Sequence, residues 1–152
     1  MGRLPNAREL ARQGVAVVVA TRDAALRPAV GRAWGPVLSD AEDELTLCVE
    51  AAPGSPMEAN LAAGSPLAAT LSRPTTYSSI QLKGAVTQIR PPTDAELERV
   101  ALHVDGFVVE TAAVGLDPAL ARRLVGQSLT MVVVAVSERY DQTPGSGAGA
   151  RL

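Results

Sequence analysis

Few side chains in this sequence could perform covalent chemistry. The 152 residues include one cysteine, Cys48, and one histidine, His103. A thiolate paired with an imidazole can act as a nucleophile. Nothing in the sequence brings Cys48 and His103 together, so we expect Cys48 to pack in or beside a strand and His103 to have a partly buried structural or a surface role. One cysteine and one histidine cannot form a zinc site, and no phosphate loop or dinucleotide fingerprint is present. We therefore predict no catalytic side chain and no metal site.

A row of polar side chains is the clearest candidate for ligand contact. Ser79, Gln81 and Lys83 alternate with Ile80 and Leu82 in a segment that has the pattern of a long β-strand. Successive strand residues point to opposite faces, so the three polar residues share one face and the two apolar residues share the other. This face is either a solvated outer surface or the wall of a ligand groove.

The elements that would position these residues follow from hydrophobic periodicity and capping signals. Strands are expected at 15–21, 27–38, 44–50, 67–72, 77–89 and 129–136, and the first is apolar enough to be buried on both faces. Helices are expected after Asn6 and at 56–63, 94–104 and 118–125. Five strands, two helices and a last strand differ from βαβ alternation. The fold class predicted is mainly β: a six-stranded antiparallel barrel with short flanking helices.

Composition limits the partners and the organisation of the chain. One domain is expected over residues 1–142, followed by a flexible glycine-rich tail over 143–152. A net charge of -2 argues against a nucleic-acid binder, and no apolar run approaches the length of a membrane span. One cysteine and no export signal favour the cytosol. With 3% aromatic residues, the core is built from aliphatic side chains, so a homodimer interface would add stability.

The segment 45–84 resembles a known cofactor-binding core. A strand is followed by Gly54 and by Ser55, which begins a short helix, and two more strands then lead to Gly84. This order is similar to the flavin-binding core of the pyridoxamine 5'-phosphate oxidase-like family, whose members are FMN-binding split barrels. The resemblance extends to the first two strands and so covers most of the chain. The positions that carry it are 45–55, Glu58, Asn60, 67–71 and 75–84.

This resemblance implies a set of cofactor-binding residues. Arg32 matches a strand position from which an arginine commonly contacts the flavin, and Ser55 matches the phosphate site. Ser79 falls where the oxidases have a glutamine against the isoalloxazine ring, and Gln81 lies on the same face. The family also implies a groove at a dimer seam. There, Tyr77 would stack on the ring or contact the ribityl chain, and Lys83 or Arg73 would bind the phosphate.

Three departures from the family pattern concern the same phosphate. Pro56 and Met57 stand where the family has an Arg-Lys pair, and Glu58 adds a negative charge in that helical turn. Ser55 is therefore either a phosphate ligand or simply the helix cap. The chain ends in Arg151 and Leu152, similar to the terminal Arg-Leu pair of the oxidases, but the oxidases' substrate-phosphate residues have no counterpart. The resemblance thus favours a smaller flavin-binding relative over a pyridoxamine 5'-phosphate oxidase.

Three functions from different classes remain open. The leading interpretation is an FMN-binding, homodimeric flavin-dependent oxidoreductase that acts on an unidentified small molecule, in which the flavin supplies the chemistry. The alternative is a non-catalytic ligand-binding module that has kept the fold and lost the flavin, which Pro56, Met57 and Glu58 favour. Haem binding ranks third, and a deazaflavin could replace FMN.

Overall fold

Six antiparallel strands close into one barrel in this computed structural model, which describes residues 6–152. Hydrogen-bonded neighbours follow the order β1-β2-β3-β6-β5-β4, and β4 pairs back with β1. This confirms the predicted fold class. The strands are β1 (Ala16–Arg22), β2 (Pro28–Leu38), β3 (Glu44–Glu50), β4 (Pro66–Ser72), β5 (Ser79–Arg90) and β6 (Leu129–Asp141); the helices are α1 (Ala7–Ala11), α2 (Pro56–Asn60), α3 (Asp94–Ala113) and α4 (Pro118–Arg123).

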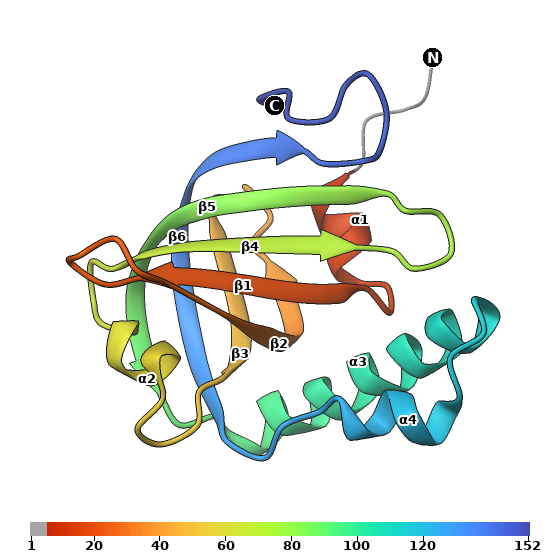
Figure 1. The fold of residues 1–152 in the computed structure, drawn as a ribbon, viewed down its shortest axis with the longest axis horizontal. Helices are drawn as coiled ribbons and strands as arrows, with labels where there is room; N and C mark the ends of the chain where they lie inside the picture. The colour runs from red at the N-terminus through yellow and green to blue at the C-terminus, as the bar shows by residue number, and fades with distance from the viewer. Residues whose placement is uncertain (1–5) are drawn as a thin grey trace.

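The barrel interior is filled by aliphatic side chains from alternate strand positions. Val17, Leu71 and Ile80 are among these residues, and each is at most 2% exposed. The two short helices α1 and α2 lie at opposite ends of the barrel (Figure 1), and Leu10 of α1 and Met57 of α2 join its core. This core cluster consists of Ala, Val, Leu, Ile and Met side chains, and the two helices contribute to it from the ends of the barrel.

A second hydrophobic layer lies outside the barrel, where α3 and α4 cover one side of it (Figure 1). Trp34 of β2 and Cys48 of β3 point outwards into this layer, where Trp34 makes an edge-to-face contact with Phe107 of α3 at 5.3 Å between ring centroids. The layer needs close approach of two backbones, because a Cβ on Gly14 would lie 2.1 Å from the carbonyl carbon of Gly106. One side of the barrel is therefore covered by helices.

Several element boundaries differ from the sequence prediction. β1 is not buried on both faces, because Val18 points outwards and is 40% exposed. α3 continues nine residues past the predicted end at Val104 and β6 five past Val136. β5 begins at Ser79 because Tyr77 adopts a left-handed turn conformation with φ 59°.

The C-terminal segment 143–152 returns along the end of β6 (Figure 1). The backbone N–H of Leu152 donates to the carbonyl of Arg139 at 2.9 Å, and Arg151 forms an isolated bridge with Tyr140. The last residues thus pair with the edge of β6 beyond the point where its pairing with β3 ends.

Within residues 6–152, no helix combines the length and the apolarity needed to cross a membrane.

Candidate functional site

The barrel wall opposite the helix layer presents an outer face made by β1, β4, β5 and adjoining parts of β2 and β6; we refer to it as the outer face. Strand pairing sets its rows of side chains. Val18 pairs with Arg32 on one side and with Thr70 on the other, Thr70 pairs with Gln81, and Gln81 pairs with Tyr140. Arg32 and Gln81 therefore share a row, three strand spacings or about 14 Å apart. Gln81 Nε2 donates to Thr70 Oγ1 at 3.2 Å.

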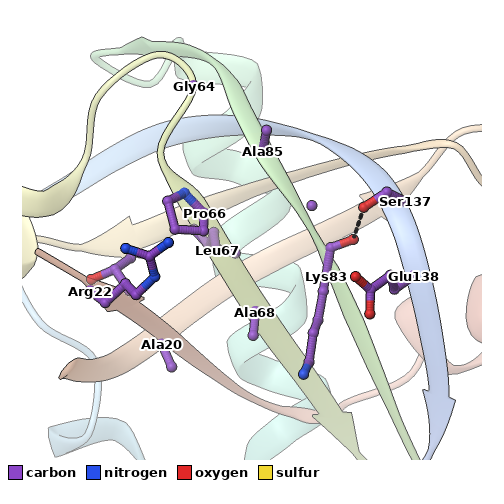
Figure 2. A pocket seen from close by; sticks show the side chains of 12 residues that line it. Ala20, Arg22, Gly64, Pro66, Leu67, Ala68, Lys83, Ala85, Ser137 and Glu138 are labelled. Atoms are coloured by element: carbon purple, nitrogen blue, oxygen red, sulfur yellow. Dashed lines mark hydrogen bonds between the residues drawn. The ribbon is translucent and has the colours of Figure 1, made fainter. Parts of the chain in front are cut away.

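The next row forms the floor of a groove of about 530 Å³ on the outer face. Ala20, Ala68 and Lys83 follow one another across β1, β4 and β5. Figure 2 shows Arg22 on one side of these alanines and Lys83 on the other. The short side chains leave a low floor between two cations, which suits a flat anionic ligand. We call this the outer groove; it is lined by Ala20, Thr21, Arg22, Gly64, Pro66, Leu67, Ala68, Lys83, Gly84, Ala85, Ser137 and Glu138.

One edge of the outer groove carries a second set of polar groups on β6. The ammonium of Lys83 lies 5.0 Å from the ring centroid of Tyr140, within the range of a cation–π contact. The hydroxyl of Tyr140 donates to the carboxylate of Glu138, and this bond raises the pKa of Tyr140. Arg151 on the returning C-terminal segment acts in the opposite sense and lowers the same pKa. Lys83, Tyr140 and Arg151 therefore lie in one electrostatic neighbourhood.

Two of the predicted site residues, Ser79 and Tyr77, lie at the turn between β4 and β5. Ser79 is 7% exposed, its hydroxyl is 2.7 Å from that of Ser72, and its N–H donates to Thr143 Oγ1 at 3.0 Å. These bonds hold the end of β5 against β4 and the C-terminal segment. Tyr77 lies in the turn between β4 and β5 and is 66% exposed. Neither residue lines the outer groove.

Arg73, the other candidate for a phosphate, is paired within the fold. Its Nε and Nη2 atoms each lie 2.9 Å from Glu110 Oε1 on α3. Thr75 Oγ1 donates to the second oxygen of Glu110 at 2.6 Å. Burial acts to raise the pKa of Glu110, but the bonds from Arg73 and Thr75 outweigh it and lower that pKa. Arg73 thus anchors the β4–β5 turn to the helix layer.

Ser55 lines a different cavity, of about 520 Å³, which we call the Ser55 pocket. Ser55 Oγ accepts the N–H of Glu58 at 3.2 Å, and Glu58 Oε2 accepts the N–H of Gly54 at 2.6 Å. Ser55 therefore caps α2, as the sequence predicts. Glu50 is the one charged residue in the lining, so the donor set does not fit a phosphate. The lining consists of Pro28, Ala29, Val30, Gly31, Glu50, Ala52, Ser55, Pro56, Met57, Gly126, Gln127 and Ser128.

The histidine and the cysteine both belong to the helix layer. His103 Nδ1 accepts the N–H of Gly35 at 3.0 Å and its Nε2 lies 2.9 Å from the carbonyl of Val15, which makes Nε2 the protonated nitrogen. Burial lowers the pKa of His103 and raises that of Cys48. His103 links α3 to two strands and has no free nitrogen. Within residues 6–152, no three His, Cys, Asp or Glu side chains gather as a metal site would require.

Sequence reasoning missed the residues that shape both cavities. Arg22, Ala20 and Ala68 line the outer groove, and Glu50 lines the Ser55 pocket. Strand parity places Ala20 and Arg22 on the same face as Val18. The pairing of β1 with β4, which brings Ala68 alongside Ala20, is a long-range contact that local pattern cannot supply.

Comparison with solved structures places this barrel among known folds. An F420 reductase is 18% identical, with 89% of this chain and 97% of that chain covered and a TM-score of 0.59. HupZ from Group A Streptococcus is 13% identical, with 94% of each chain covered and a TM-score of 0.54. A candidate pyridoxamine 5'-phosphate oxidase from Lactobacillus delbrueckii is 14% identical over 92% of this chain and 97% of that chain, at a TM-score of 0.49.

These likenesses show the fold. The chain shares the barrel fold of the F420 reductase and of HupZ, in agreement with the split-barrel fold that the resemblance of segment 45–84 implies. At identities of 18% and 13%, the fold is all that they establish. No protein-family model and no curated protein sequence matches the chain.

Proposed function

We propose that this protein binds a flavin-type cofactor, FMN or a deazaflavin, on its outer face and serves as an oxidoreductase for a small molecule. The observation that carries the proposal is the outer groove, where a floor of alanines lies between the cations Arg22 and Lys83. A flat ring can lie against small side chains, and an anionic tail can pair with the cations. When bound, such a cofactor supplies the redox chemistry.

The electrostatics of the two cavities support this location. In the Ser55 pocket the one charged lining residue is the anion Glu50, whereas the outer groove has two cations and one anion, Glu138. A dianionic phosphate would therefore be repelled from the first and attracted to the second. Arg32 and Gln81, one row away on the same face, are available for contacts to the rest of the cofactor. We infer that Lys83 and Arg22 replace the Arg-Lys pair that the sequence lacks.

The F420 reductase of similar fold gives the deazaflavin alternative a basis, because that protein is named for a cofactor of this class. The proposal includes a homodimer whose interface is the outer face, where Val18 and Val30 are 40% and 67% exposed. A second copy would cover these apolar side chains and close the outer groove.

A second candidate function is a binding module without a flavin. Pro56, Met57 and Glu58 at the start of α2, together with Glu50 in the Ser55 pocket, favour it. Haem binding loses its support, because both nitrogens of His103, the one histidine of the chain, are hydrogen-bonded in the interior. The absorption spectrum of the purified protein separates these functions: flavin or deazaflavin bands support the proposal, and a Soret band supports haem.

The decisive test is titration with FMN and with riboflavin, which lacks the phosphate. We expect the wild type to prefer FMN. Lys83→Ala and Arg22→Ala should each weaken FMN binding by about one to two decades and leave riboflavin binding unchanged, because one charged hydrogen bond contributes about 1.5–3 kcal/mol. Arg32→Ala tests the neighbouring row in the same way.

Arg73→Ala is the matched control, since Arg73 is paired with Glu110 and lies outside the outer groove. It should reduce stability without changing the preference for FMN over riboflavin. If the wild type binds none of FMN, riboflavin and F420, the proposal is wrong and the second candidate function, a binding module without a flavin, takes its place. If Arg73→Ala alone removes the preference, the phosphate lies at the β4–β5 turn and the outer groove is the wrong site.

A further inference from the structure

The Ser55 pocket holds a carboxylate that is fixed by the fold. Glu50 is the last residue of β3, and its Oε1 atom accepts two hydrogen bonds, from Trp34 Nε1 and from the backbone N–H of Gly126, both at 2.6 Å. Gly126 permits this approach, because a Cβ there would lie 2.8 Å from the carboxyl carbon of Glu50. Three separate elements thus position one carboxylate, which costs rotamer entropy that a merely solvated surface glutamate does not lose.

This carboxylate has no cationic partner among residues 6–152. The ion pairs of the described chain join Arg8, Arg27, Arg73, Arg90, Arg99, Arg122 and Arg139 to other acids, and Glu50 is in none of them. Both hydrogen bonds that it accepts go to Oε1, and Oε2 receives none from the described residues. A half-buried anion with one free oxygen is a strong acceptor for a cation that enters the pocket.

The remaining lining has two chemical parts. Ser55, Gln127 and Ser128 place hydroxyl and amide groups around the pocket, and each can accept a hydrogen bond through its oxygen. Pro28, Val30 and Met57 provide apolar surface from β2 and α2. The cavity of about 520 Å³ is in the size range of small-molecule sites. A ligand complementary to this lining has a hydrogen-bonding cationic end and a short apolar body.

We propose that the Ser55 pocket binds a small organic cation, a primary ammonium attached to a short aliphatic chain, through the carboxylate of Glu50. The ammonium donates to Glu50 Oε2 and to the neighbouring polar oxygens, and the chain lies on Pro28, Val30 and Met57. A divalent metal matches this site less well, because the lining supplies one carboxylate and no second acidic, histidine or cysteine ligand to balance its charge. The site is separate from the outer groove and does not depend on the proposed flavin.

The test uses n-hexylammonium as the probe, with 1-hexanol and hexanoate as its neutral and anionic counterparts. Trp34 is the sole tryptophan and donates to Glu50, so its fluorescence reports on the carboxylate. We expect n-hexylammonium to change Trp34 emission in a saturable way and to show the same affinity by calorimetry. The two counterparts should bind at least tenfold more weakly, because neither carries the positive charge that forms an ion pair with Glu50. Equal binding of hexanol and hexylammonium would overturn the proposal.

Two variants locate the site. Glu50→Gln keeps an oxygen that can accept from Trp34 and Gly126 and removes the charge, so it should weaken hexylammonium binding about tenfold or more. Gln127→Lys adds a competing cation at an exposed loop position of the lining and should weaken binding similarly without touching the core. Glu58→Gln, which removes a nearby charge outside the lining, should bind as the wild type does.

The outcomes are distinct from those of the flavin test. Loss of hexylammonium binding in Gln127→Lys, with wild-type binding in Glu58→Gln, supports the site even if Glu50→Gln fails to fold. Unchanged binding in a folded Glu50→Gln, or in Gln127→Lys, overturns it. All measurements are made on the full chain without added flavin, so a protein that binds no flavin can still support this inference, and a flavoprotein can still contradict it.

Discussion

Among single residues, the strongest electrostatic coupling lies in the helix layer. Glu96 at the start of α3 accepts from both terminal nitrogens of Arg90, at 2.8 and 2.7 Å, and also from the N–H of Thr93 at 2.8 Å. The Arg90 bonds are the largest cause of a pKa of about 2 for Glu96, against an ordinary value of 4.5. A capping box and a bidentate ion pair therefore join at one carboxylate, where β5 passes into α3.

Glu96→Gln should lower the free energy of unfolding by about 1–3 kcal/mol at neutral pH, because it removes a charge-assisted pair. The folded pKa lies below the ordinary one, so the contribution of Glu96 is complete above pH 4.5 and is lost as the pH falls towards about 2. Urea unfolding at several pH values measures the difference. Glu98→Gln, at an exposed position of the same helix, should show almost no loss. A loss that persists undiminished at pH 2 would contradict the assignment.

His103 should make stability pH-dependent near neutrality. Burial holds its pKa below the ordinary value of 6.5, so the unfolded chain takes up a proton before the folded one does. Its contribution is complete above pH 6.5 and is lost as the pH falls below that value, with a slope of up to about 1.4 kcal/mol per pH unit. Urea unfolding followed by Trp34 fluorescence should show this slope in the wild type. His103→Gln should be less stable at pH 7.5 and should lack the slope; the same slope in both proteins would rule His103 out as its source.

Sequence reasoning located some candidate site residues better than others, for reasons that the contacts make clear. Strand parity correctly put Gln81 and Lys83 on one face, because alternation is a local property. It could not reveal that Arg73 is paired with Glu110, since these residues are 37 positions apart. The burial of Ser79 likewise depends on Thr143, which lies 64 positions away. Residue type and spacing suggested contacts, and tertiary pairing decided which side chains remain available.

Among the secondary-structure elements, the strands were predictable and several ends were not. β3 matches its predicted bounds because Leu45, Leu47 and Val49 alternate cleanly and face the core. α3 extends nine residues past its predicted end at Val104, because the helix continues through Gly106 to Ala113. The outward exposure of Val18 could not be read from a continuous apolar run, which is equally typical of a strand covered on both faces.

Gly14, in the loop before β1, packs closely against Gly106 of α3. A Cβ on Gly14 would lie 2.1 Å from the carbonyl carbon and oxygen of Gly106, so Gly14→Ala must displace backbone and should cost about 1–3 kcal/mol of stability. Gly106→Ala is the matched control: its Cβ would lie 3.3 Å from the Cα of Gly14, which must then shift by only a few tenths of an ångström, and the helix preference of alanine, about 1 kcal/mol, offsets this cost. Urea unfolding of both variants measures the difference: the midpoint of Gly14→Ala should be lower than that of Gly106→Ala. Equal midpoints would show that α3 shifts without cost.

In the whole molecule, the two sides of the barrel have different roles. Trp34, Cys48 and Met131 point outwards under α3 and α4, so that side is covered within the chain. On the outer face, Val18 and Val30 lie uncovered among small residues such as Ala20 and Ala68. The chain topology explains this division. α3 and α4 form the connection between β5 and β6, and they pack on the barrel over Trp34, Cys48 and Met131. The uncovered side is the one that holds the outer groove, so the proposed cofactor site and the proposed dimer interface share one side of the barrel.

The proposed homodimer can be tested at its interface. A stable interface buries roughly 800 Å² on each partner, and Val18 lies in a central strand of the outer face, so a lysine there would be left charged and buried. Wild-type protein should sediment as a dimer at micromolar concentration, and Val18→Lys as a monomer. Leu102→Lys, which changes a residue 73% exposed on α3, should stay dimeric. A wild-type monomer would refute the dimer, and a monomeric Leu102→Lys would move the interface to the helices. Because the second copy closes the outer groove, a Val18→Lys monomer should also bind FMN more weakly than the wild type.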